Sequence, residues 1–147
     1  MIHPLPWNES SGTGVGNDFG HIPNYPGGYH SGIDMHAPRG EGVLAAASGI
    51  VVYADDTGGD YGNRVDICHG DHLYTVYAHL DEIYVVAGDM APEGDEIGSC
   101  GSSGNSNGYH LHFEVRKGGN SKENCVDPMA YIQPKPSYFS QANLRTD

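Results

Sequence analysis

The 147-residue sequence has no run of 18 apolar residues and few basic residues. Without such a run, a membrane-spanning helix is excluded. Only seven Lys and Arg stand against 19 Asp and Glu, which gives a formal net charge of −12. Binding to nucleic acid requires clustered basic side chains, so this composition argues against nucleic acid as a partner. The first residues also lack the basic and apolar regions of a secretory signal peptide.

Cysteine is also scarce. Cys68, Cys100 and Cys125 are widely spaced and form no CxxC, which disfavours a zinc site built from thiolates. Two arrangements remain open, namely one disulfide with one free thiol, or three buried thiols.

A third absence concerns helices, since no 3.6-residue apolar period persists for several turns. The 22 glycines are spread along the chain, as expected of turns in a β protein. The length suits one domain with one core. We therefore predict a mostly β, antiparallel, sandwich-like single domain with a groove, long loops and little helix.

Several segments have the composition of strands separated by turns. The predicted hairpin joins residues 64–68 to residues 73–79 through the turn His69-Gly70-Asp71. A single helical turn is predicted near residues 127–132. The other predicted strands are residues 49–53, 83–86, 96–99 and 109–116.

The strand at residues 110–115 carries the most chemical information. Successive side chains of a strand point to opposite faces, so Leu111, Phe113 and Val115 should enter the core. His110, His112 and Glu114 then share the other face. Two imidazoles on one face suit one metal ligand and one neighbouring acid–base group.

Two further segments supply candidate partners. His30 and Asp34 lie four residues apart in a glycine-rich segment that we expect to form a loop and a short strand. With one more histidine they would give three protein ligands and an open fourth position for water, the pattern of a catalytic zinc site. His36 is kept as an alternative ligand. His79 ends a strand on which, by alternation, Thr75 and Tyr77 should share its face.

The ordered set His30-x-x-x-Asp34, Tyr77-Ala78-His79-Leu80 and His110-Leu111-His112-Phe113-Glu114 resembles the M23 peptidases, the lysostaphin/LytM-like zinc endopeptidases. The resemblance covers roughly residues 18–132. It implies that Zn²⁺ is held by His30, Asp34 and His112, that His110 is the general base and that His79 is a second catalytic histidine. It also implies a tyrosine that stabilises the transition state, for which Tyr25 is the first choice and Tyr29 the alternative.

The implied activity is hydrolysis of the peptide crosslinks of bacterial peptidoglycan by water activated on zinc. The implied organisation is an irregular lead-in (residues 1–20), the peptidase domain (21–133) and a weakly ordered tail (134–147). We expect a monomer located outside the cell or in the cell wall or periplasm, and a phage endolysin or virion lysin fits equally.

Two rival functions remain. The first is a zinc D-Ala-D-Ala-type carboxypeptidase or amidase of another family, which the close His30/Asp34 and His110/His112 spacings disfavour. The second is a wall-binding protein with a vestigial zinc site. Inactive members of the family lack ligands, whereas all five positions are present here.

Overall fold

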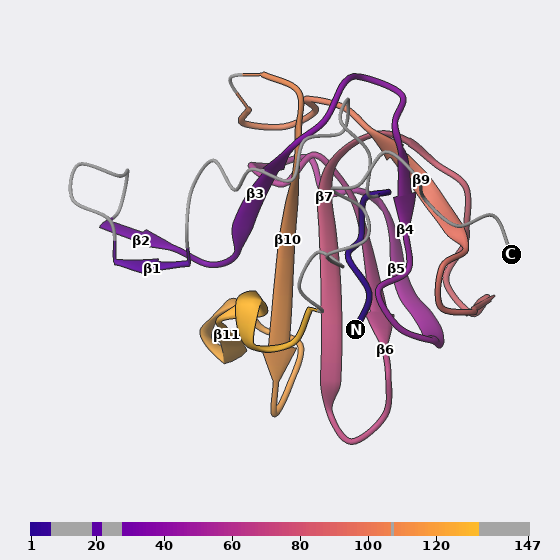
Figure 1. Ribbon diagram of the computed structural model, residues 1–147, viewed down its shortest axis with the longest axis vertical. Helices are drawn as coiled ribbons and strands as arrows, with labels where there is room; N and C mark the ends of the chain where they lie inside the picture. The colour runs from indigo at the N-terminus through magenta and orange to yellow at the C-terminus, as the bar shows by residue number, and fades with distance from the viewer. Residues whose placement is uncertain (7–18, 22–27, 107, 133–147) are drawn as a thin grey trace, which may run out of the picture.

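The computed structural model describes residues 1–6, 19–21, 28–106 and 108–132. The regular secondary structure there is almost entirely β strand, with two short 3₁₀ turns (Figure 1). The predicted tail and most of the lead-in fall outside these ranges. The elements are β1 (Gly20–His21), β2 (Tyr29–His30), β3 (Ile33–His36), β4 (Gly42–Leu44), β5 (Gly49–Asp56), β6 (Asn63–Cys68), β7 (Leu73–Ile83), β8 (Met90–Ala91), β9 (Glu96–Cys100), β10 (His110–Lys117), η2 (Lys122–Asn124), β11 (Cys125–Val126) and η3 (Pro128–Ala130).

All the described strand pairs are antiparallel, in one nine-stranded sheet and a two-stranded sheet of β1 and β2. The main path runs β11-β10-β7-β6-β5-β8, with β3 added to β10 and the β4/β9 pair added to β7. The mostly β, antiparallel single domain with almost no helix is thus confirmed. The pairing links the nine strands into one continuous sheet.

Strand β7 changes its partner along its length. Its first part pairs with β10, up to Ala78 opposite His112, whereas Leu80 and Ile83 pair with β9. His79 lies at the change and has a φ of 62°, a conformation rare for residues other than glycine. The change of partner therefore occurs at the residue predicted to be catalytic.

The conformation of His79 overturns one prediction from alternation. Tyr77 does not share a face with His79, because Tyr77 is fully buried and its ring packs on Phe113 in the core. The positive φ breaks the two-residue period between Tyr77 and His79. Alternation does hold on β10, where Leu111, Phe113 and Val115 belong to the core cluster as predicted.

The other predicted elements have mixed outcomes. The hairpin of β6 and β7, strand β9 and the helical turn η3 are present where expected. The strand predicted at residues 83–86 is wrong, because β7 ends at Ile83 and the following residues form no strand. Tyr84 and Val86 are largely exposed there, so their β propensity reflects no sheet position.

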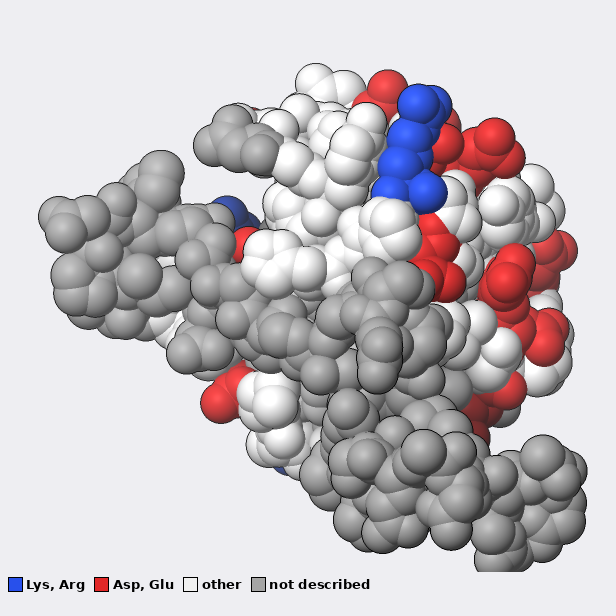
Figure 2. Space-filling model, turned by 45° about the horizontal axis from the view of Figure 1, so that its top comes forward, with Lys and Arg blue, Asp and Glu red and all other residues white. Residues whose placement is uncertain are grey.

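The surface agrees with the acidic composition. Asp and Glu gather along one side of the face in Figure 2, and few Lys or Arg lie among them on its described part. Among the described helices, none has the length and apolarity needed to cross a membrane.

Candidate metal centre

The pairing of β3 with β10 brings the predicted ligands together. Asp34 lies directly opposite His112 in the register, and β2 delivers His30 just before β3 begins. Gly32 permits this approach, since a Cβ at that position would lie 2.2 Å from the carbonyl oxygen of Phe113. A glycine between the two ligands thus lets their strand lie close to β10.

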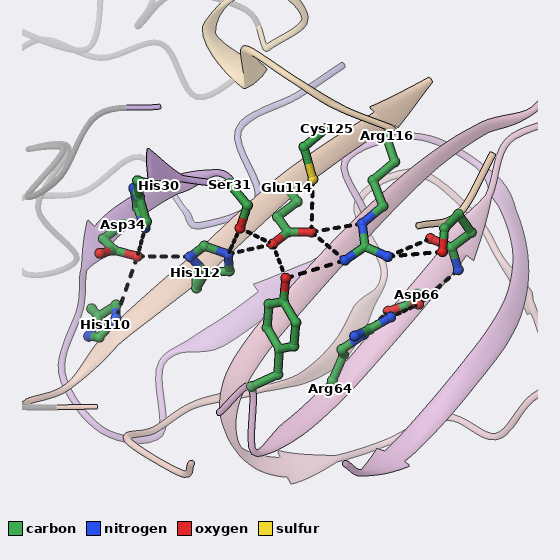
Figure 3. Close-up of polar contacts among 12 residues, drawn as sticks. His30, Ser31, Asp34, Arg64, Asp66, His110, His112, Glu114, Arg116 and Cys125 are labelled. Carbon is green, nitrogen blue, oxygen red and sulfur yellow. Dashed lines mark hydrogen bonds and ion pairs between the residues drawn. The ribbon is translucent and has the colours of Figure 1, made fainter. Parts of the chain in front are cut away.

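The three predicted ligands converge in the structure. One atom from each of His30, Asp34 and His112 lies within 4.8 Å of the others, and all three residues are buried. Asp34 Oδ1 is 3.3 Å from His30 Nε2 and 3.1 Å from His112 Nδ1 (Figure 3). Ligands held tetrahedrally at zinc's usual bond lengths stand about 3.3 Å apart. Two imidazole nitrogens and a carboxylate oxygen at this spacing therefore fit Zn²⁺.

His79 and His110 lie beside this triad. Their ring centroids are 4.9 Å apart, and the ring centroid of His79 is 5.9 Å from that of His112. His110 Nε2 is 3.6 Å from Asp34 Oδ1. All five predicted positions thus meet at one site, although four strands (β2, β3, β7 and β10) contribute them from distant parts of the sequence.

Backbone carbonyls orient His79 and His110. His79 Nδ1 donates to the carbonyl of Ser103 at 2.8 Å, and His110 Nδ1 lies 3.2 Å from the carbonyl of Gly108. A carbonyl can only accept, so Nδ1 carries the proton in both neutral rings. The Nε2 atoms are then left as proton acceptors.

The environments of the histidines drive their pKa values apart. Burial lowers the pKa of His79 to about 4 and also lowers that of His110. Burial acts in the same direction on His112, but its hydrogen bonds to Asp34 and Glu114 outweigh it and raise the pKa to about 9 in the absence of metal. Burial would raise the pKa of Asp34, yet His112 and His30 hold it well below its usual range.

The remaining predicted site residues are Tyr25, Tyr29 and His36. Tyr25 lies outside the described residues. Tyr29 is 47% exposed and its ring contacts Phe19. His36 is exposed on β3 opposite His110 and is not among the three converging ligands.

The structure adds four residues to which the sequence analysis gave no role. Glu114 and Ser31 contact His112, Tyr61 packs on its ring, and Ser103 holds His79. Alternation did place Glu114 on the correct face, so that contact could have been foreseen. Ser31, Tyr61 and Ser103 come from loops, whose contacts no periodicity reveals.

The chain is similar to several known proteins. Residues 28–128 match the family described as Peptidase family M23. The chain is 40% identical over 107 residues to the DD-carboxypeptidase/endopeptidase Mpg of Neisseria meningitidis, covering 73% of this chain and 24% of Mpg. It is 37% identical over 105 residues to the murein hydrolase activator NlpD of Escherichia coli, covering 71% of this chain and 26% of NlpD.

The fold is also similar to that of a solved structure. The catalytic domain of the antimicrobial peptidase lysostaphin from Staphylococcus simulans superposes with a TM-score of 0.76 at 32% identity. The match covers 80% of this chain and 90% of that domain. The chain thus corresponds to nearly all of a catalytic domain, and to about a quarter of the length of Mpg and NlpD.

Proposed function

Because the chain belongs to peptidase family M23, we propose that it is a zinc endopeptidase that hydrolyses peptide crosslinks of bacterial peptidoglycan. The observation that carries this proposal is the convergence of His30, Asp34 and His112, with two further histidines beside them. A vestigial site would not need the acid–base pair, and a purely structural zinc site would use a fourth protein ligand.

The three ligands would hold zinc, which supplies Lewis acidity and lowers the pKa of a coordinated water to about 7. His30, Asp34 and His112 are buried, so the metal would lie in a site largely shielded from bulk water. In such a site, charge that develops during hydrolysis is stabilised more strongly than in bulk water.

His110 and His79 would move the protons. His110 Nε2, close to Asp34, is placed to take the proton of the attacking water. His79 Nε2 is likewise an acceptor while the ring is neutral, so His79 must gain a proton before it can donate one. The proton that His110 takes from the water would pass to the leaving amine, either directly or through His79, whose low pKa of about 4 would make its protonated ring a strong donor.

The loops beside His79 border this site. Residues 57–63 and 101–106 are joined by hydrogen bonds from the backbone N–H of Asn63 to Ser103 Oγ and from that of Asn105 to the carbonyl of Asp60. Gly62 and Gly104 make a close backbone contact there. We infer that these loops form one wall of a groove for thin, glycine- or D-Ala-containing peptides.

The test is digestion of purified peptidoglycan sacculi of different crosslink types, with mass analysis of the released fragments. Cleavage of a peptide crosslink that depends on added Zn²⁺ and disappears with a chelator is expected. Release of terminal D-Ala alone would indicate a carboxypeptidase. Tight zinc binding with no cleavage of any peptidoglycan would overturn the enzyme proposal and favour an activator, the function named for NlpD.

This substrate also sets the location. Peptidoglycan lies outside the cytoplasmic membrane, so we propose that the protein acts in the cell wall or periplasm. A phage lysin would reach the same substrate, and the crosslink cut would be the same in either setting.

A further inference from the structure

Glu114 lies at the centre of a buried polar network directly behind the metal ligands (Figure 3). It is 0% exposed and follows His112 on the same face of β10. Its Oε2 contacts Ser31 Oγ at 2.5 Å, Tyr61 Oη at 2.5 Å and His112 Nε2 at 2.8 Å. Its Oε1 contacts Arg116 and, at 3.3 Å, the thiol of Cys125.

Every one of these partners is a donor. An ionised carboxylate only accepts hydrogen bonds, so the proton of the short contact with His112 must sit on Nε2 of the ring. In the neutral ring, Nδ1 then carries no proton. Its lone pair faces Asp34, and the distance from Nδ1 to Asp34 Oδ1 is 3.1 Å. Two acceptors at this distance require a proton or a cation between them.

The carboxylate is itself held in place by charge. Arg116, 2% exposed, contacts Oε1 through Nε at 2.8 Å and through Nη2 at 2.7 Å. Arg116 Nη1 continues to Asn120, which donates to Asp66 Oδ2 at 3.0 Å. Arg64 binds both oxygens of Asp66 at 2.7 Å. Two of the chain's seven basic residues thus support this one region.

Stability alone does not account for such a network. A buried ion pair is expensive to desolvate, and well-packed apolar side chains of similar size stabilise a fold as well or better. The network is also directional, since it ends on the one nitrogen of His112 that faces away from Asp34. Carboxylates that accept from a metal-bound histidine fix its tautomer and raise its basicity as a ligand.

We propose that Glu114, held by Arg116, Tyr61 and Ser31, is a positioning residue that fixes His112 in the tautomer and orientation required for binding metal through Nδ1. The inference rests on the zinc site of the proposed function. Glu114 touches neither metal nor substrate, and it acts only through His112. The effect is therefore expected first on metal affinity and only then on turnover.

The test compares the wild type with Glu114→Gln by calorimetric titration of the metal-free protein with Zn²⁺ and by the visible spectrum of bound Co²⁺. Glutamine has the same shape, but its NH₂ group would face donors in either orientation. Zinc affinity should fall about 10- to 100-fold while the circular dichroism spectrum stays native. The Co²⁺ bands should shift, because the orientation of His112 changes.

Two further variants make the test decisive. Glu93→Gln removes the same charge from an exposed residue and should bind zinc like the wild type. Tyr61→Phe removes one donor to Glu114 without adding another, and it should weaken zinc binding by less than Glu114→Gln does. If Glu114→Gln does not fold, Tyr61→Phe decides the question.

Unchanged zinc affinity and an unchanged Co²⁺ spectrum in a folded Glu114→Gln protein would overturn the positioning role while leaving the peptidase proposal intact. If Glu114→Gln does not fold, the same result for Tyr61→Phe would overturn it. A wild-type protein that binds no zinc would instead overturn the metal site and, with it, the proposed function.

Discussion

The two halves of the site hold their histidines by different means. On the proposed metal side, His112 is fixed by hydrogen bonds to two carboxylates, and a chain of ion pairs extends behind it. On the proposed proton-transfer side, His79 and His110 are held by backbone carbonyls of the loop between β9 and β10. Charged partners favour a strongly basic ligand, whereas burial with neutral partners lowers the pKa of a histidine and suits a group that must both take up and release protons.

The sharpest test of this division replaces each of the two histidines of β10 with alanine in turn. His112→Ala should lose both bound zinc and activity, since a ligand is removed. His110→Ala should keep zinc but lose activity by about 10²- to 10⁴-fold, the usual contribution of a general base. Metal content after dialysis, measured beside turnover of sacculi, separates the outcomes. Release of zinc by His110→Ala would show that the two roles have been exchanged.

Gly32 provides a second test on the metal side. A Cβ at Gly32 would lie 2.2 Å from the carbonyl of Phe113, so Gly32→Ala should push β3 away from β10. Overpacking of this kind costs about 1–3 kcal/mol, and here it also separates Asp34 from His112. We expect a lower melting temperature and clearly weaker zinc binding by titration. Wild-type zinc affinity in this variant would mean that the close strand contact does not set the ligand geometry.

Gly104 offers the matching test on the proton-transfer side. Its φ is +75°, and a Cβ would lie 2.4 Å from the backbone nitrogen of Gly62. Gly104→Ala should therefore displace Ser103 and with it His79, lowering kcat several-fold while zinc stays bound. Gly58→Ala is the control, because Gly58 has a φ of +70° with nothing within 4 Å. Backbone strain alone costs about 1–2 kcal/mol.

Thermal unfolding and kcat would be measured for both alanine variants. Equal losses of stability and activity in Gly58→Ala and Gly104→Ala would mean that strain, and not displacement of the loop, accounts for the effect. Loss of zinc from Gly104→Ala would show that the two halves are not independent.

The same division explains what the sequence could reveal. The strand periodicity of β10 predicted which side chains enter the core, because an antiparallel strand keeps a strict two-residue period. The predicted ligand set, His30, Asp34 and His112, was implied by the family resemblance, and these residues converge in the structure. The same periodicity places Glu114 on the face of His112, so the contact between these two residues could have been predicted.

The proton-transfer side was harder to predict. The orientation of His79 depends on a positive φ and on the carbonyl of Ser103, which lies 24 residues away in the sequence. No local pattern encodes either feature, and strict alternation wrongly grouped His79 with the buried Tyr77. Loop backbone contacts arise only when the whole sheet has formed, which is why they escaped the sequence analysis.

The smallest expected effect concerns pH. Burial lowers the pKa of His79 to about 4 and that of His110 below its ordinary value of 6.5, so both rings stay neutral as the pH falls below 6.5. Bound zinc, being positive, would lower them further. The acid limb of kcat/KM should therefore have its midpoint below pH 6.5. The profile would be measured between pH 4 and 8 with zinc content determined at each point, since loss of metal would mimic the limb. A midpoint at or above 6.5 with zinc retained would show that burial does not set the protonation of these two histidines.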